Sequence, residues 1–381
     1  MRNKPRIRFK GFTEDWEQRK LGEFVKIVSG DAPSTFISGN CVYVKVDDLN
    51  YSDRIQLSSS NLVNANPKAH LVNQGATIFP KRGAAIMTNK VRIMGKDGYL
   101  DTNMMALIPE EIDKDFLFTF IQKTGLYKIA DTSTIPQINN KHIEPYMIQV
   151  PSEKEQAYIG VVFKKIDKII TLHQRKLEKL KLANKALLQK LFPKNGSKFP
   201  ELRFKGFADA WEQRKLCQIT TRVTRKNGDQ SDLPLTISAQ DGLVDQRKYF
   251  NRQVASRDMS NYYLIKKGEF AYNKSYSEGY PFGAVKRLDY YDIGALSTLY
   301  ILFEITDNNI SSDFIVSYYM THLWYKEISK RAAEGARNHG LLNISTEDFF
   351  DSELNIPNSI EEKVKIGNFI KQFDKFITLH Q

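Results

Sequence analysis

The stretch RFKGFTEDWEQRKL, from Arg8 to Leu21, occurs a second time as RFKGFADAWEQRKL, from Arg203 to Leu216. The two copies lie 195 residues apart, and 11 of their 14 positions are identical. Chance does not produce such agreement, so the chain contains an internal duplication. The duplication decides the fold class, because two copies of one structural unit are then expected in the 381 residues.

A second duplicated stretch follows each copy. SEKEQAYIGVVFKKIDKIITLHQ runs from Ser152 to Gln174, and SIEEKVKIGNFIKQFDKFITLHQ runs from Ser359 to Gln381. The segments between the motifs are similar in length but differ in sequence. Repeated ends around unlike middles predict one scaffold that carries two different recognition surfaces.

The second duplicated stretch predicts a long helix. Ser152 with Glu155, and Ser359 with Glu362, have the spacing of a capping box at a helix start. Apolar residues then recur at spacings of four and three, which is typical of a coiled-coil seam. The seam residues are Ile159, Phe163, Ile166, Ile170, Leu177, Leu180, Leu187 and Leu191 in the first copy, and Ile366, Ile370, Phe373 and Ile377 in the second.

The first helix is expected from about Glu153 to Phe192, which is roughly 60 Å at ~1.5 Å per residue. Two seams in one chain would most simply pair with each other. An antiparallel pair would relate the two units by a pseudo-twofold axis. Asn184 and His173 occupy seam positions, where a polar residue often sets the register of the pair.

The segments between the helices have mixed α/β patterns, so the predicted fold class is α+β. Strands are expected at Cys41–Leu49 and in GATIFPKRG, GEFAYNKS, PLTISAQDG and LYILFEI. One amphipathic helix is expected over residues 115–130, and a matching helix over residues 312–335.

The charge of the chain favours a polyanionic partner. Lys and Arg number 56 against 44 acidic residues, a formal net charge of +12. Residues 164–198 alone contain 11 basic and 2 acidic side chains. This basic stretch is either a solvated helix face or a spine for DNA or for an acidic protein.

Polar loops follow the amphipathic helix of each segment, at residues 131–142 and 335–345. Asn and Gln can pair with adenine edges and Arg with guanine edges, although Asn and Gly also favour ordinary turns. The candidate DNA-binding residues are Lys81, Arg82, Asn89, Lys90, Gln137, Asn139, Asn140 and Lys141 in the first segment, and Ser238, Gln240, Asn273, Lys274, Arg337, Asn338 and His339 in the second.

Motifs for catalysis, metals and membranes are missing from the sequence. There is no Walker A motif, no H-E-x-x-H, no nucleophile elbow and no Asp/Asn-Pro-Pro-aromatic signature of amino-methyltransferases. Two cysteines, Cys41 and Cys217, support neither a disulfide framework nor zinc. No catalytic residue, metal or cofactor is therefore expected. With no apolar run of ~18 residues and no signal peptide, the protein is expected in the cytoplasm.

With these motifs, the chain resembles the specificity subunits of type I restriction-modification systems. The resemblance is carried by both duplicated motifs, by CVYVKVDDL and LVNQGATIFPKRG, and by the STIPQINNKHIEPYMIQVPSEKEQ block. It implies two target recognition domains that each read half of a bipartite DNA sequence. It also implies conserved helices that pair as an antiparallel coiled coil, set the separation of the domains and dock two methyltransferase subunits.

The resemblance implies further that restriction subunits join this core. The chain would be non-catalytic by itself and would confer specificity on an adenine methyltransferase and ATP-dependent endonuclease. S-adenosylmethionine, ATP and magnesium would belong to the partner subunits. The second segment departs from the family pattern, since GARNHGLLNI stands where the first has STIPQI.

The resemblance divides the chain into six parts. They are an N-terminal conserved motif (1–19), recognition domain 1 (20–151), the central conserved helix (152–193), a linker with the repeated motif (194–215), recognition domain 2 (216–357) and a distal conserved helix (358–381), which stops 18 residues before its first copy does.

Two other functions stay open from the residues alone. The chain could be a free-standing DNA-modifying enzyme, which methyl transfer by the isolated chain would reveal. It could also be a coiled-coil scaffold or defective specificity subunit that does not read DNA, which sequence-specific binding of a methyltransferase complex would exclude.

Overall fold

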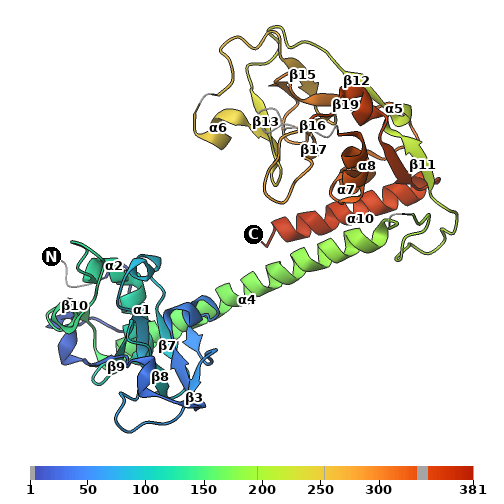
Figure 1. Ribbon diagram of the computed structural model, residues 1–381. Helices are drawn as coiled ribbons and strands as arrows, with labels where there is room; N and C mark the ends of the chain where they lie inside the picture. The colour runs from blue at the N-terminus through green and yellow to red at the C-terminus, as the bar shows by residue number, and fades with distance from the viewer. Residues whose placement is uncertain (1–4, 195, 253, 333–341, 381) are drawn as a thin grey trace. The chain divides into compact units, whose positions relative to one another are not determined.

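The computed structural model of the protein describes residues 5–194, 196–252, 254–332 and 342–380 (Figure 1). The chain divides into two compact units, Met1–Arg175 (unit 1) and Lys176–Gln381 (unit 2). The division falls inside the long helix α4 (Glu153–Leu191), which begins in unit 1 and ends in unit 2.

Unit 1 is closed by strands from its two ends. β1 (Glu17–Lys20), from the duplicated motif, pairs antiparallel with β10 (Met147–Val150), and Glu17 lies opposite Val150. Between them lie a five-stranded sheet, in the order β2-β9-β6-β7-β4, and a three-stranded sheet, β5-β3-β8. Their strands are β2 (Val25–Ser29), β3 (Ser38–Val44), β4 (Ile55–Gln56), β5 (Leu62–Val63), β6 (Thr77–Pro80), β7 (Arg92–Met94), β8 (Gly98–Leu100) and β9 (Met104–Pro109).

The helices of unit 1 are short, apart from α1 and α4. They are η1 (Leu21–Glu23), η2 (Pro33–Thr35), η3 (Val46–Asn50), η4 (Ala84–Thr88), α1 (Lys114–Thr124), α2 (Leu126–Ile129) and α3 (Asn140–Ile143). α1 packs Phe116, Leu117 and Ile121 into the same buried cluster as Phe79 of β6. The central strand β6 is buried along its whole length, which fixes the position of the loop that leaves it at Lys81.

Two predictions for unit 1 were wrong in their bounds. The strand expected over Cys41–Leu49 ends at Val44, because the Asp48 carboxylate accepts the Lys45 N–H at 2.8 Å and turns the chain into η3. The helix expected over residues 115–130 is interrupted at Gly125, whose φ of +84° no regular helix contains.

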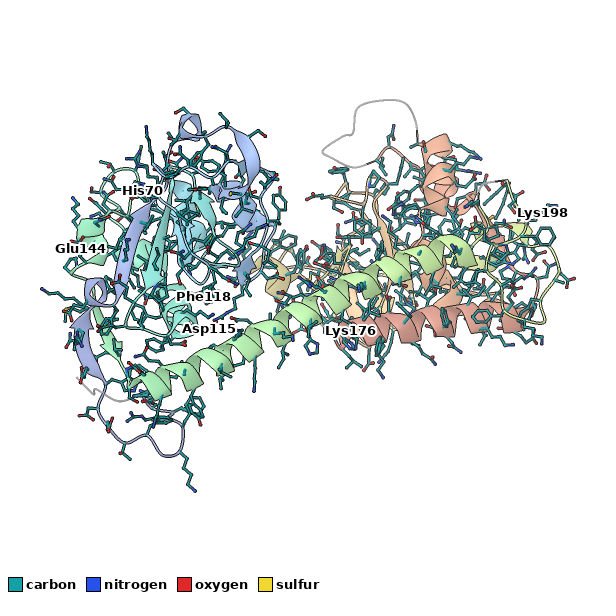
Figure 2. All side chains as sticks on the ribbon, turned by 90° about the horizontal axis from the view of Figure 1, so that it is seen from below. His70, Asp115, Phe118, Glu144, Lys176 and Lys198 are labelled. Atoms are coloured by element: carbon teal, nitrogen blue, oxygen red, sulfur yellow. The ribbon has the colours of Figure 1, made fainter. Side chains whose placement is uncertain are left out.

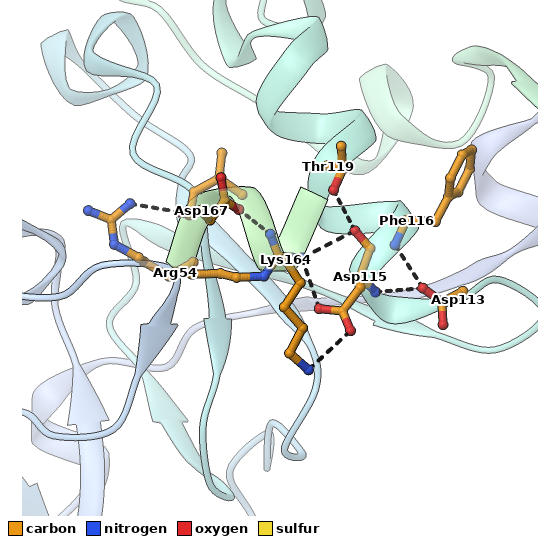
Figure 3. Close-up of polar contacts among 9 residues, drawn as sticks. Arg54, Asp113, Asp115, Phe116, Thr119, Lys164 and Asp167 are labelled. Atoms are coloured by element: carbon orange, nitrogen blue, oxygen red, sulfur yellow. Dashed lines mark hydrogen bonds and ion pairs between the residues drawn. The ribbon is translucent and has the colours of Figure 1, made fainter. Parts of the chain in front are cut away.

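The first turns of α4 are held against α1 by close packing and by charge. A Cβ on Gly160 would lie 2.7 Å from Asp113 Oδ1 and 2.8 Å from Asp115 Cβ, so only glycine permits this approach. Arg54 donates to Asp115 Oδ1 at 2.8 Å and also binds Asp167 of α4 (Figure 3). Lys164 lies 3.5 Å from the other Asp115 oxygen.

The Arg54 guanidinium also lies 4.2 Å from the ring centre of Phe118. Figure 2 shows Phe118 near Asp115, and both belong to α1. Side chains of the strand region, α1 and α4 thus meet at one arginine.

The helix α4 spans Glu153–Leu191, so the helix predicted over Glu153–Phe192 is confirmed to within one residue.

Unit 2 is closed in the same way as unit 1. β11 (Glu212–Lys215) pairs antiparallel with β20 (Glu353–Ile356), and Glu212 lies opposite Ile356. A four-stranded sheet has the order β12-β19-β16-β17, and β13-β14 and β15-β18 form two further pairs. The strands are β12 (Thr220–Val223), β13 (Leu235–Ser238), β14 (Gly242–Asp245), β15 (Tyr263–Lys266), β16 (Phe270–Asn273), β17 (Ala284–Arg287), β18 (Ile293–Leu296) and β19 (Ile301–Ile305).

The described helices of unit 2 are α5 (Leu216–Ile219), α6 (Gln246–Phe250), α7 (Ser312–Tyr319), α8 (Leu323–Arg331), α9 (Thr346–Phe350) and α10 (Ile360–Thr378). The single helix predicted over residues 312–335 is wrong, because α7 and α8 are separated by residues 320–322. The Thr321 hydroxyl donates to the Tyr318 carbonyl at 2.6 Å and accepts the Leu323 N–H at 3.3 Å, so it caps both helices at the break. Residues 333–335 lie outside the described part.

α10 packs beside the last turns of α4 and runs in the opposite direction (Figure 1). Ile366 and Ile370 of α10 are buried in one cluster with Leu191 of α4. Asn184 is 8% exposed and donates to Asp374 Oδ1 at 2.8 Å. Burial raises the pKa of Asp374, and the hydrogen bond from Asn184 opposes this shift.

Candidate nucleic-acid interface

One ion pair joins the two duplicated motifs in each unit. In unit 1, Arg8 binds Glu155 through two hydrogen bonds of 2.8 and 2.6 Å. In unit 2, Arg203 binds Glu362 through two bonds of 2.8 Å. Both carboxylates are 1% exposed. Each unit therefore has the same frame, and the loops that differ between the units are carried on it.

The predicted capping box is only half formed at α10. The Ser359 hydroxyl accepts the Glu362 N–H at 3.2 Å, as a capping serine does. The Glu362 carboxylate is bound instead by Arg203. The Arg–Glu pairs were not found from the sequence, although both partners lie in duplicated motifs, and this shared duplication was the available signal.

In unit 1, two loops that are far apart in the sequence are bonded to each other. The Gly83 N–H donates to the Pro136 carbonyl at 2.8 Å, and the Ile138 N–H donates to the Lys81 carbonyl at 2.9 Å. Between these two hydrogen bonds, the backbones of Arg82 and Gln137 form an antiparallel β-bridge. The structure thus brings together three predicted DNA-binding residues, Lys81, Arg82 and Gln137.

The side chains on this loop pair differ in how freely they can reach a ligand. Arg82, Asn140 and Lys141 are exposed, the last two in the first turn of α3. Lys81 is partly buried, and burial, followed by the charge of Arg82, lowers its pKa. Asn139 precedes α3, and its N–H donates to His142 Nδ1 at 3.1 Å.

Asn89 and Lys90 are committed to the fold of unit 1. Asn89 has a φ of +50°. Its side-chain amide donates to the Gln122 carbonyl at 2.8 Å and accepts the Leu126 N–H at 2.9 Å. Lys90 binds the side chain of Asn50. Both ends of the Asn89 amide are therefore occupied, and this residue positions the loop.

In unit 2, an equivalent hydrogen bond lies at the end of strand β16. The Leu342 N–H donates to the Lys274 carbonyl at 3.0 Å, as Ile138 does to Lys81. Lys274 Nζ donates to the Ile344 carbonyl at 3.3 Å, and Asn273 accepts the Ser275 N–H at 3.0 Å. Arg337, Asn338 and His339 lie outside the described residues.

The turn between β13 and β14 holds the two remaining candidates. Ser238 is 3% exposed, and its hydroxyl donates to Asp241 at 2.8 Å, so it shapes the turn. Gln240 is exposed and lines an open hollow of about 830 Å³ inside unit 2. Four basic and four acidic residues line this hollow. Such a balance does not favour phosphate binding.

The seam residues are covered to very different degrees. Ile366, Ile370, Ile377 and Leu191 are buried. Ile159, Leu177, Leu180, Leu187 and Phe373 are partly buried. Phe163, Ile166 and Ile170 are 42%, 42% and 49% exposed, and they form an exposed stripe on the first half of α4.

Within the described ranges, no helix has both the length and the apolar character needed to cross a membrane. The same residues contain no cluster of three or more His, Cys, Asp or Glu side chains placed to hold a metal ion.

Residues 13–182 match the family model of the type I restriction modification DNA specificity domain. This match covers residues 13–21 of the first duplicated motif, the loops of unit 1 and most of α4. The class defined by the sequence is therefore that of a DNA specificity domain, and the resemblance inferred from the duplicated motifs is confirmed. Residues 13–182 thus form a domain of the type found in type I restriction-modification specificity subunits.

The type I restriction enzyme MjaVIII specificity subunit of Methanocaldococcus jannaschii is 26% identical over 218 residues, which are 54% of this chain and 49% of that protein. The chain thus matches about half the length of that curated relative. The fold is similar to that of the type I specificity subunit from M. genitalium, with a TM-score of 0.60 and 13% identity over 98% of this chain and 92% of that one.

A second solved chain has a TM-score of 0.52 and 14% identity, over 97% of this chain and 92% of its own length. It comes from work on complex assembly and conformational transition of the type I R-M system. At these identities the two likenesses concern the fold alone.

Proposed function

We propose that the chain is the DNA-reading specificity subunit of a type I restriction-modification complex and is non-catalytic by itself. Its two recognition domains, residues 20–151 and 216–357, each read one half of a bipartite target. The observation that carries this proposal is the repeated Arg–Glu frame with unlike loops at the end of the central strand in each unit. One scaffold with two different loop sets suits a two-part DNA sequence.

Base reading is assigned to the exposed polar side chains of these loops. In unit 1 they are the exposed Arg82 and Asn140 and the partly exposed Gln137, which have the donors and acceptors that base edges require. In unit 2, the exposed Gln240 of the turn between β13 and β14 has the same chemistry. In unit 1, Lys81 and Lys141 supply positive charge beside the polar side chains of the loop pair. Positive charge there suits phosphate contacts, which hold the protein in register on the DNA.

The duplicated helices are proposed to form an antiparallel coiled coil in the complex and to bind two methyltransferase subunits. The hydrogen bond between Asn184 and Asp374 supports a fixed register for the pair. The exposed stripe Phe163, Ile166 and Ile170 supports a protein partner, because apolar side chains gathered on one helix face favour burial in an interface. Restriction subunits would join this core, and the cofactors S-adenosylmethionine, ATP and magnesium would be bound by the partners.

Co-expression of the chain with its methyltransferase partner tests the proposed function. We expect methylated adenines at a single bipartite sequence, and no such methylation when the chain is omitted. The measurement is genome-wide mapping of methylated adenine. Methylation without sequence preference would instead support a scaffold that does not read DNA, and methyl transfer by the isolated chain would show an enzyme.

A double variant tests the exposed stripe as the methyltransferase contact. Ile166→Asp with Ile170→Asp is expected to weaken methyltransferase binding by about 2 kcal/mol, or roughly thirtyfold, because buried apolar contacts carry most interface energy. Binding is measured by calorimetry or by sedimentation of the mixed subunits. The matched control is Lys165→Asp with Lys168→Asp on the same helix. Equal binding by the stripe variant and by the unmodified chain would exclude this contact.

A further inference from the structure

The segment that follows β14 is strongly basic and was not singled out from the sequence. Residues 246–257 read QRKYFNRQVASR, with four basic and no acidic side chains. Its described residues are those of α6 together with 251, 252 and 254–257, and Figure 1 shows α6 at the margin of unit 2. By contrast, the hollow beside Gln240 has equal numbers of basic and acidic residues.

α6 is fixed to unit 2 at its start. The Asp245 carboxylate, 5% exposed, accepts the Arg247 N–H at 3.0 Å and binds the Arg247 guanidinium at 3.1 and 3.2 Å. The Gln246 N–H donates to the Pro234 carbonyl at 2.9 Å. These bonds hold the first turn in place, so the side chains that follow it are presented from a defined backbone.

Three of the four basic side chains are available for a ligand. Lys248, Arg252 and Arg257 are exposed, and the described part of the chain offers none of them an ion pair. Arg247 is already paired with Asp245. Three unpaired positive charges within ten residues repel one another, and a polyanion would relieve this repulsion.

Two aromatic rings stand among these charges. Tyr249 and Phe250 are 51% and 43% exposed, and their ring centres lie 5.0 Å apart at an interplanar angle of 86°. Exposed rings between basic side chains are typical of surfaces that contact nucleic acid, where rings pack on sugars or bases and cations bind phosphates.

We propose that residues 246–252 and 254–257 bind the sugar-phosphate backbone of duplex DNA next to the half-site read by unit 2. The proposal rests on the proposed function and adds a surface to it. β14 (Gly242–Asp245) connects this segment to the turn that holds Gln240. Its four residues span ~13 Å, about four nucleotides along one strand, so both ends of β14 can contact one DNA site.

The test compares the complex of the chain and its methyltransferase with the double variant Lys248→Ala/Arg252→Ala. The probes are a duplex that carries the mapped target and a duplex of scrambled sequence, each titrated between 50 and 200 mM salt. We expect about tenfold weaker binding to both duplexes and a salt slope reduced by about two, since each phosphate contact contributes ~0.9. The methylated sequence should not change.

Lys267→Ala is the matched control, because Lys267 is an exposed lysine of unit 2 that already pairs with Asp292 at 3.4 Å. Thermal melting of each variant checks folding. An unchanged affinity and salt slope in the double variant would overturn the inference while leaving the proposed function intact. Weaker binding to the target duplex alone would also overturn it, because that result is the signature of base reading.

A tyrosine series separates the ring from the charges. Tyr249→Ala is expected to weaken binding to both duplexes severalfold without changing the salt slope, and Tyr249→Phe should retain most of the affinity. Full affinity in Tyr249→Ala would remove the ring from the proposed surface. If the unmodified complex fails to prefer the target duplex, the proposed function itself has failed, whatever the variants do.

Discussion

Replacement of residues 216–357 by the second recognition domain of another specificity subunit is expected to change one half of the methylated sequence completely and to leave the other half intact. The physical reason is the frame of unit 2. The replaced segment begins after β11 and ends after β20, and the Arg203–Glu362 pair outside it remains. The incoming domain would supply its own counterpart of β20, while β11 and the Arg203–Glu362 pair would be unchanged. Mapping of methylated adenines before and after the exchange gives the result.

The reciprocal exchange of residues 20–151 is the control, because it should alter only the other half of the target. The Arg8–Glu155 pair lies outside that segment in the same way. Changes in both halves after a single exchange would contradict separate reading by the two units. Loss of all methylation would call for a check of folding, by thermal melting, before the exchange is interpreted.

The substitution Glu362→Ala is expected to destabilise unit 2 by about 3 kcal/mol, because it leaves the Arg203 guanidinium without its partner. The carboxylate is 1% exposed and the guanidinium 15%. α10 would lose the link that joins its first turn to the duplicated motif, so DNA reading by unit 2 should weaken with its stability. Chemical denaturation of the full chain measures the loss.

The double variant Arg203→Met/Glu362→Leu is the matched control. Removal of both charges leaves no unpaired ion, so most of the lost stability should return. Glu155→Ala is expected to act in the same direction on unit 1, where Arg8 would lose the same two hydrogen bonds. If Glu362→Ala melts like the unmodified chain, the pair is not a structural support of the frame.

Much of the frame could be predicted from the sequence because its signals are local or repeated. The heptad spacing from Ile159 to Leu191, with the capping residues before it and Pro193 after it, predicted α4 to within one residue, since these signals need no knowledge of a partner. Short connections were less predictable. Gly125 interrupts one expected helix and the Thr321 hydroxyl caps another break, and such local geometry competes with the average helical preference of the residues around it.

The residue types of the candidate interface could be predicted from the sequence. Which of these side chains are free to contact DNA could not. Gln137 and Asn89 have the same side-chain chemistry, and their sequences do not distinguish them. The structure does, because the Asn89 amide is used by Gln122 and Leu126, whereas Gln137 lies on the bonded loop pair with Arg82. The basic segment 246–257 was missed because its charge is small beside that of residues 164–198.

By itself, the sequence determined the duplication, the family, the long helix and the lack of known catalytic motifs, since all of these are properties of residues along the chain. Only the tertiary structure decided which copies of the seam are covered. Ile370 is 1% exposed and Phe163, its counterpart in the repeat, is 42% exposed, although both have the same spacing from their capping residues. The reason is that burial depends on what another part of the chain places against a side chain. Leu191 of α4 lies in the buried cluster of α10, whereas the described residues of unit 1 leave Phe163 exposed.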